Sequence, residues 1–485
     1  MDKKVRSHFD LQRARNKEKV AEGADRISEL PDVVLHHILS FLSTTEVLKT
    51  AFLGRRWRYL WTHIPTIHFD EEKFSTLESN GKFVNFVDNI LNSYNAISMQ
   101  KFYLLSSSFI SMQSIERWFS FAADWNVKEI NVQVSNRGPY TIKLPRCESV
   151  RVLSLEFQLQ DVEFCSGTFS SLEFLSLERV LLDDNIGDVI SKACPRLKTL
   201  HLLRCQGINS LRIGGLVLED LKIERCVGLD TLSISGYQLQ SLCVQDSFDY
   251  RSGSSCVDIS APNLQTFKWL DFVVSCFSMK NAPSLNHAHI CLLFDFYPVA
   301  IVDYLQKATK LLCNLLCASC LTIEMVCFWD VSTQKNLLER LPVTLRNNIK
   351  QLIVWLDCDD AYVFGGISCL LESCPRLESL LVNIVDHQTH RAITNEFPDM
   401  PVSDKHWRYP NSSLDHLADV KIREFKGKEY EIEFVKFLLE YARALKGLII
   451  ILSREISDVE STKSQIFQKV RALKTASSDV KISCF

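Results

Sequence analysis

Apolar residues recur through the middle of the chain in the pattern L-x-x-L-x-L, with isoleucine, valine or an aromatic residue replacing some leucines. Clear copies begin at Val150, Leu172, Leu197, Ile208, Leu218, Leu229, Leu239 and Leu264, and weaker ones at Leu285, Ile349 and Leu377. Most copies start about 20 to 30 residues apart, which leaves room for one strand and a return segment. Between Ile208 and Leu239 the spacing falls to about 10 residues, too short for a helix between strands.

Self-similarity at this period indicates a solenoid of leucine-rich repeats, whose copies stack because none can bury its apolar side alone. The apolar positions should point into the stack, where one buried leucine contributes roughly 1.5–3 kcal/mol. The residues between them should face outward along a parallel sheet. A mixed polar row there suits protein binding, although a merely solvated face shows the same pattern. The candidate target-binding residues are Ser176, Glu178, Thr199, His201, Asp220, Lys222, Glu224, Gln245, Lys268 and Trp355.

Residues 25–70 carry the pattern of short amphipathic helices instead. Pro31 suits a first helical turn, and apolar residues follow at helical spacing from Val34 to Leu42. A second short helix is predicted over Val47 to Phe52 and a third over Arg55–Trp61. About 40 residues in three short helices cannot bury this much apolar surface among themselves, so some of it should face a partner. The preceding residues 1–21, with seven basic and three acidic side chains, are expected to be a disordered basic tail.

The helical stretch resembles an F-box, the adaptor-binding motif of cullin-type ubiquitin ligases, and most resembles its plant branch. The matching elements are Asp25–Ser28, Leu30-Pro31, Ile38–Leu42 and Arg55–Trp61. The resemblance implies docking on a Skp-type adaptor (ASK in plants) and, through it, on a cullin. The expected adaptor contacts, some of which must instead hold the three helices together, are Leu30, Pro31, Val34, Ile38, Leu39, Leu42, Val47, Leu48, Trp57 and Leu60. Among them Trp57 is of the type that anchors interfaces.

The last part of the chain alternates strand-like and helix-like segments. Strands are predicted at Leu417–Ile422, at Leu448–Leu452 and from Val480 to Cys484, with helices at Glu431–Leu445 and Ser464–Leu473. The strands start about 30 residues apart, so this region could be the last turns of the same solenoid. It also resembles the FBD domain that ends many plant F-box leucine-rich-repeat proteins, on Leu417–Phe425, Gly427 and Glu433–Leu452.

The predicted fold class is therefore α/β. An N-terminal three-helix F-box precedes a leucine-rich-repeat solenoid, a parallel sheet with helical or irregular returns, and a C-terminal βαβαβ FBD unit follows. The expected boundaries are 1–21 for the basic tail, 22–70 for the F-box, 71–395 for the solenoid and 396–485 for the FBD domain.

Composition narrows the functional classes. The net charge of −3 argues against a protein that coats nucleic acid. The apolar stretch Leu311–Trp329 is interrupted by polar residues and divides into a helix over Val299–Ala318 and a strand over Leu321–Phe328, so no membrane span is expected. The 17 cysteines come without a secretory signal pattern at the N-terminus, so we expect reduced thiols and a location in the nucleus, the cytoplasm or both.

Motifs of catalysis are not found in the sequence, which shows no P-loop, G-x-G-x-x-G, H-E-x-x-H or G-x-S-x-G. Cys313, Cys317 and Cys320 contain one C-x-x-C without a second pair at zinc-site spacing, and buried thiols are expected there. His387 and His390 lie in a polar stretch without nearby ligands. We therefore expect no enzyme activity, no cofactor and no metal.

The main hypothesis is a substrate-recognition subunit of an SCF-type (Skp–cullin–F-box) ubiquitin ligase, in which the repeat region holds an unknown target protein for ubiquitination and proteasomal degradation. The alternative is a non-degradative interaction protein that acts with the adaptor but without a cullin. Direct nucleic-acid binding needs a basic stripe, whereas the outward row mixes Asp220 and Glu224 with Lys222.

Overall fold

The structure, a computed structural model, describes residues 27, 29–74, 80–95, 99–135, 140–164, 169–249, 253–280, 282–292, 301–315, 317–325, 329–330, 335–336, 348–357, 367, 371, 374–385, 414–457 and 460–485. The predicted tail 1–21, the pair His387 and His390, and part of the F-box resemblance at Asp25–Ser28 lie outside the described residues. The chain divides into two compact units. Unit 1 comprises Met1–Arg137 and Pro145–Leu153, and unit 2 comprises Gly138–Leu144 and Ser154–Phe485.

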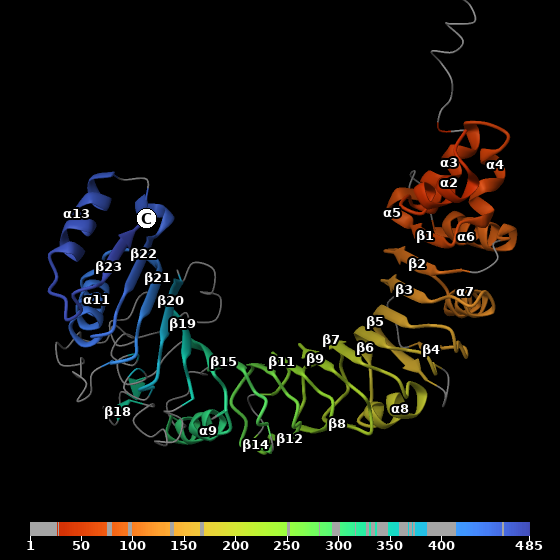
Figure 1. The fold of residues 1–485 in the computed structure, drawn as a ribbon. Coiled ribbons are helices and arrows are strands. Elements are labelled where there is room, and N and C mark those ends of the chain that lie inside the picture. The colour runs from red at the N-terminus through yellow and green to blue at the C-terminus, as the bar shows by residue number, and fades with distance from the viewer. Residues whose placement is uncertain are drawn as a thin grey trace, which may run out of the picture. The chain divides into compact units, whose positions relative to one another are not determined.

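Unit 1 begins with the three predicted short helices (Figure 1). These are α2 (Asp32–Leu39), α3 (Thr44–Lys49) and α4 (Trp57–Leu60), with 3₁₀ turns η1 (Thr50–Phe52) and η2 (Trp61–His63) after the second and third. The third helix is shorter than expected and begins at Trp57. We call residues 30–64 the helical module.

Parallel strands follow the helical module within unit 1. Strands β1 (Thr66–Asp70), β2 (Lys101–Ser106) and β3 (Glu129–Val134) pair in register, with α5 (Glu71–Phe74), α6 (Asn80–Ser93) and α7 (Met112–Asp124) between them. These β-α units lack the L-x-x-L-x-L pattern and were not recognised as repeats in the sequence. Their signal is simple alternation, as in Phe102 and Leu104, which are buried. The expected domain boundaries stay a prediction.

Unit 2 is built on one long parallel sheet, which we call the main sheet. Strand β4 (Thr141–Lys143) pairs with β5 (Val152–Glu163). The strands from β6 onward then pair one after another, all in parallel. They are β6 (Phe174–Leu181), β7 (Thr199–Leu203), β9 (Asp220–Glu224), β11 (Ser241–Gln245), β13 (Thr266–Leu270), β15 (His287–Leu292), β16 (Cys320–Met325), β19 (Gln351–Asp357) and β20 (Ser379–Val385). The two-residue strands β17 (Trp329–Asp330) and β18 (Lys335–Asn336) pair antiparallel on their own.

A second parallel sheet explains the ten-residue spacing. It contains β14 (Cys276–Lys280), β12 (Cys256–Ser260), β10 (Thr231–Ser235) and β8 (Ser210–Gly214), in that order. Figure 1 shows β8, β12 and β14 in line with the helices α8 (Ile186–Ala193) and α9 (Ile301–Cys313), across the repeats from β7, β9 and β11. The expectation that every copy is a strand followed by its own return segment was therefore wrong here. The copies beginning at Ile208 and Leu229 are themselves return segments, with strands in place of helices.

The core of unit 2 is made by the apolar positions of the repeats, as predicted. Leu175, Leu200, Leu221 and Leu242 occupy equivalent positions on successive strands and are all fully buried. The helix and strand predicted within Leu311–Trp329 are confirmed as α9 and β16. In the part of the chain that the structure describes, no helix is long and apolar enough to span a membrane.

Cysteine side chains link successive repeats within this core by hydrogen bonds near the strand ends. Cys205 and Cys226 are buried, and their thiols donate to the carbonyl oxygens of Leu177 (3.3 Å) and Leu202 (3.4 Å) on the preceding main-sheet strand. Cys194 and Cys374, elsewhere in the repeats, are buried as well. The expectation of buried thiols is confirmed for Cys320, but Cys313 is only half-buried and Cys317 lies exposed just beyond the end of α9.

A buried carboxylate, Asp271, holds the next turn of the solenoid. It accepts hydrogen bonds from the backbone N–H groups of Ser247 (2.6 Å), Phe272 (2.8 Å) and Phe248 (3.2 Å). Burial raises the pKa of this carboxyl to about 6 despite these donors. Asp271 therefore satisfies three backbone groups at the cost of burying a titratable side chain.

The C-terminal alternation is confirmed as β21 (Asp419–Phe425), α11 (Glu429–Tyr441), β22 (Gly447–Leu452), α12 (Arg454–Ser457), α13 (Glu460–Arg471) and β23 (Lys481–Cys484). Strand β21 pairs in parallel with β20, so these strands continue the main sheet. Gly427 has a φ of +72°, and a Cβ atom there would lie 2.6 Å from the side chain of Ile466 on α13. The assignment of this region to an FBD domain stays a prediction.

Candidate functional site

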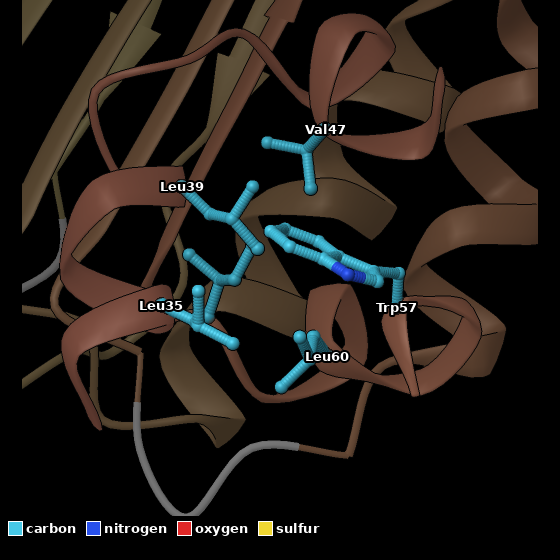
Figure 2. Close-up of a cluster of buried hydrophobic side chains, with 6 residues drawn as sticks. Leu35, Leu39, Val47, Trp57 and Leu60 are labelled. Carbon is cyan, nitrogen blue, oxygen red and sulfur yellow. The ribbon is translucent and has the colours of Figure 1, made fainter. Parts of the chain in front are cut away.

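The helical module has a core around one tryptophan. Figure 2 shows the indole of Trp57 pointing toward Leu35 and Leu39, with Val47 and Leu60 on either side. Trp57 is only 5 % exposed. Four of the expected adaptor contacts, Leu39, Val47, Trp57 and Leu60, therefore belong to the core. The interpretation of Trp57 as an interface anchor is corrected accordingly, because its ring already packs within its own module.

Polar contacts fix the ends of these short helices. Ser43 and Glu46 form a capping box at the start of α3, in which the Glu46 carboxylate accepts from the Ser43 backbone N–H (2.9 Å) and from its hydroxyl (2.7 Å). These bonds lower the pKa of Glu46. Arg56 donates to the carboxylate of Asp32 and to the carbonyl oxygen of Leu30 (2.7 Å), which joins the segment before α4 to the start of α2. The module is thus held in one shape although it is small.

A second set of apolar side chains in the module points to solvent. The expected contacts Val34, Ile38 and Leu42 are 41 %, 43 % and 37 % exposed, Pro31 is exposed, and Leu30 and Leu48 are half-buried. Other apolar side chains, which were not among the expected contacts, are more exposed than these: Val33, Phe41, Phe52, Leu53 and Tyr59. Phe52 is 93 % exposed and Phe41 77 %. We call the exposed residues Val33, Val34, Ile38, Phe41, Leu42, Phe52, Leu53 and Tyr59 the module surface.

The signal for this surface was present in the sequence of α2. Leu35 and Leu39, spaced by four, face the core, and Val34 and Ile38, also spaced by four, face solvent. A helix of eight residues with two adjacent apolar stripes has more apolar side chains than one small core can cover. Single apolar residues on a surface are ordinary, but so many exposed apolar side chains in one small module make it a candidate for binding a partner.

The outward row of unit 2 lies on the main sheet. Register places Ser176, His201 and Lys222 side by side, and Thr199 beside Asp220. Glu224 is opposite Gln245, and Lys268 follows on β13. Trp355 lies further along, on β19, and is 40 % exposed. The remaining member, Glu178, is on β6. The structure therefore brings most of the predicted residues together across β6 to β13 and places Trp355 apart from them.

Charges in this row are paired with one another. His201 contacts Asp220 (3.0 Å) and Lys222 contacts Glu224 (2.9 Å). The hydrogen bond with His201 lowers the pKa of the Asp220 carboxyl. Paired charges at a partly exposed surface add little stability, so their arrangement matters more for choosing a partner than for the fold.

Backbone geometry at the strand ends carries a further repeat that the sequence did not reveal. Arg179 lies within β6, and Arg204 and Arg225 directly follow β7 and β9. Their φ values are 53°, 54° and 54°. A left-handed conformation is uncommon for residues other than glycine, and here it recurs on successive main-sheet strands. Arg204 donates its backbone N–H to Glu224 (2.7 Å) across the sheet, and its side chain contacts Glu178 (3.0 Å). Each of the three arginines pairs with a carboxylate, Arg179 with Glu156 and Arg225 with Asp246, and that of Arg204 belongs to the outward row.

Unit 2 also contains a cavity of about 870 Å³, for which the sequence carries no signal. It lies where the second-sheet strands end and α9 ends, and its lining includes Tyr237, Met279, Asn314 and Cys317. Within the described residues no three histidine, cysteine, aspartate or glutamate side chains gather in a way that could hold a metal ion.

A small helical module with a large exposed apolar surface, joined in one chain to a leucine-rich-repeat solenoid, defines a class of interaction protein. Comparison with protein families identifies the parts. The F-box domain matches residues 27–68. The LRR repeats of FBD-associated F-box protein At5g56370 match residues 115–288, and the LRR domain of At1g61320/AtMIF1 matches residues 214–478. The chain belongs to the F-box/LRR-repeat family, and its resemblance to an F-box is confirmed.

Relatives from Arabidopsis thaliana match over nearly the whole chain. F-box/LRR-repeat protein 13 is 29 % identical, covering 96 % of this chain and 98 % of the relative. F-box/FBD/LRR-repeat protein At1g78750 is 25 % identical, covering 91 % and 93 %. FBD-associated F-box protein At5g22730 is 24 % identical, covering 89 % and 88 %.

Proposed function

We propose that this chain is a substrate-recognition subunit of an SCF-type ubiquitin ligase. In this proposal the module surface binds a Skp-type adaptor and, through it, a cullin, while the outward row of the main sheet binds a target protein. The chain itself does no chemistry. It raises the local concentration of target lysines at the site of ubiquitin transfer, which converts a bimolecular encounter into an almost intramolecular one.

The observation that carries this proposal is the module surface. Phe52, Val33, Phe41 and Tyr59 are each more than two-thirds exposed, at 93 %, 78 %, 77 % and 71 %. Fully burying one such side chain in a partner contributes roughly 1.5–3 kcal/mol. Because the module's own core is complete without them, these side chains are available for an interface. The F-box match over residues 27–68 supports a Skp-type adaptor as the occupant.

Target binding is proposed on the main sheet for a different reason. Its outward row carries charges of both signs that are already paired, such as Lys222 with Glu224. The row can therefore form specific hydrogen bonds and ion pairs without presenting a strong electrostatic field of one sign. Trp355, 40 % exposed on a rigid strand, is the aromatic side chain of this face best suited to anchor a partner. This combination fits a folded or extended protein target better than a nucleic acid, which requires a basic stripe.

Adaptor binding is tested with the full chain and a purified Skp-type adaptor. The double substitution Phe41→Ala/Phe52→Ala should weaken binding by about 30-fold or more, since one interface hot spot contributes at least about 2 kcal/mol. Tyr237→Ala provides the matched control, because Tyr237 is an aromatic residue 78 % exposed in unit 2. Failure of the wild-type chain to bind the adaptor, or unchanged binding by the double variant, would refute the proposal.

The degradative role is tested separately, by affinity purification from plant cells with the proteasome blocked. We expect the adaptor, a cullin and a target protein to co-purify, and the target's half-life to lengthen when the module surface is substituted. Adaptor binding without a cullin, and without a change in partner half-life, would support the non-degradative alternative instead. Purification from separated nuclear and cytoplasmic fractions also tests the expected location.

A further inference from the structure

Two exposed cysteines lie side by side on the second sheet of unit 2. Cys256 begins β12 and Cys276 begins the neighbouring edge strand β14, and the two residues are direct register partners. Both are exposed. The next residues of the two strands, Val257 and Phe277, are buried, so the cysteine side chains leave the sheet on its outer face.

The spacing of these strands fits a disulfide. Neighbouring strands lie about 4.7–4.9 Å apart, and bridged cysteines have Cα atoms about 4.4–6.8 Å apart. Cys256 and Cys276, as direct register partners on neighbouring strands, meet this condition. The pKa of Cys256 is raised, first by partial desolvation and then by the sulfur of Cys276. The two side chains are therefore close enough for one thiolate to disfavour the other.

The chain provides an internal comparison. Cys205 and Cys226 also neighbour each other on successive repeats, but they are 0 % and 2 % exposed and their thiols donate to backbone carbonyl oxygens. Cys317 is exposed but does not pair with either cysteine of the second sheet in register. Among the cysteines that the structure describes, Cys256 and Cys276 thus combine solvent access with a partner in reach.

We propose that Cys256 and Cys276 form a redox-responsive dithiol that a small disulfide of the glutathione type converts into an intramolecular disulfide. One cysteine sulfur attacks the oxidised glutathione, forming a mixed disulfide and releasing one glutathione thiolate. The second cysteine sulfur then attacks the cysteine sulfur of that mixed disulfide and releases the second glutathione. The two thiol protons end on the two glutathione thiolates, so the protein loses two hydrogen atoms and one disulfide is reduced.

Oxidation would tie the edge strand of the second sheet to its neighbour. Strand β14 is tied to the end of α9, because Met279 donates its backbone N–H to the side-chain oxygen of Asn314 (2.9 Å), the residue that follows this helix. Both of these residues line the cavity of about 870 Å³. An exposed disulfide is of the labile, reversible kind rather than the structural kind. The bridge would therefore fix one wall of the cavity under oxidising conditions and release it on reduction, independently of the proposed ligase function.

The test uses the full reduced chain, exposed to oxidised glutathione, blocked with N-ethylmaleimide and mapped by mass spectrometry after proteolysis. We expect a peptide cross-linked between Cys256 and Cys276 that has lost two hydrogen atoms and retains no glutathione on either cysteine. Cys256→Ser and Cys276→Ser should each keep one glutathione on the remaining cysteine. Cys317→Ser is the matched control and should still form the cross-link. Cys205 and Cys226 should remain unlinked unless the chain is first unfolded.

A second measurement does not depend on oxidation. Phenylarsine oxide, a trivalent arsenical that bridges paired thiols, should bind the wild-type chain and the Cys317→Ser variant, and either single substitution in the pair should abolish this binding. Separate glutathione adducts on Cys256 and Cys276 in the wild-type chain would overturn the proposal. So would arsenical binding that survives Cys256→Ser.

Discussion

Replacing Trp57 by alanine separates the core of the helical module from its surface. Trp57 is 5 % exposed, whereas Tyr59, two residues further along the same helix, is 71 % exposed. The two side chains are aromatic and belong to the same short element, α4. Trp57→Ala should therefore destabilise the module, and Tyr59→Ala should leave its stability unchanged while weakening adaptor binding.

The size of the effect follows from the buried surface. A tryptophan buries roughly 150–250 Å², which at about 25 cal/mol per Å² corresponds to about 4–6 kcal/mol. Large-to-small substitutions of buried aromatic residues cost about 3–5 kcal/mol. A core of this size rarely supplies more than about 3–5 kcal/mol in total, so the loss is enough to leave the module largely open. An exposed substitution such as Tyr59→Ala changes stability by less than about 0.5 kcal/mol.

Hydrogen exchange followed by mass spectrometry measures this locally. In Trp57→Ala the amides of α2 should exchange more than about 100-fold faster, since each 1.4 kcal/mol corresponds to a factor of ten. In Tyr59→Ala their exchange should stay within about a factor of two to three. Strands β9 and β11 serve as an internal reference. Unchanged exchange of α2 in Trp57→Ala, together with a selective loss of adaptor binding, would show that Trp57 is a contact residue and that the reasoning is wrong.

Three further predictions concern stability. In the folded protein the pKa of Asp271 is about 6, above the ordinary 3.8. The protonated carboxyl therefore contributes its full stabilisation of the fold below about pH 4, and this stabilisation is lost as the pH rises through 6. Between about pH 4 and pH 6 the free energy of unfolding of the wild type should fall by about 1.4 kcal/mol per pH unit relative to that of Asp271→Asn. Urea unfolding of both proteins measures this difference. Gly427→Ala places a Cβ only 2.6 Å from Ile466 on a backbone with a φ of +72°, and should lower the free energy of unfolding by roughly 1–3 kcal/mol. Gly253→Ala is the control, because the space around Gly253 is open, and it should leave the urea midpoint unchanged. Ser43→Ala removes the capping box of α3 and should lower its stability to hydrogen exchange by about 1 kcal/mol.

The repeat pattern predicted the core of the solenoid well because strand geometry fixes it. Successive side chains on a strand point to opposite faces, so the apolar positions of L-x-x-L-x-L must share one face. Leu200, Leu221 and Leu242 follow this rule, and the polar residues between them face outward. Which sheet a strand joins could not be read in the same way. The copy at Ile208 and the copy at Leu218 have the same pattern, yet β8 belongs to the second sheet and β9 to the main sheet.

The candidate adaptor contacts could be predicted as a region but not residue by residue. Helix α2 carries apolar residues on two adjacent faces, and periodicity alone does not say which face packs inward. Leu39 and Ile38 are neighbours in the sequence, and one is 2 % and the other 43 % exposed. The left-handed arginines and the paired cysteines could not be predicted from the sequence for another reason. Backbone angles and register between strands are set only when distant segments meet in the folded chain.

From β7 to β14, successive strands belong alternately to the main sheet and to the second sheet, so the number of strands between two points decides which sheet a strand joins. Deleting one ten-residue copy, such as residues 215–224, would shift every following strand of the run to the opposite sheet and set its outward residues on the wrong face. Deleting two consecutive copies would remove one strand from each sheet and leave the remaining strands where they were. Changes in length within residues 199–280 should therefore be tolerated in steps of two copies and rejected in steps of one.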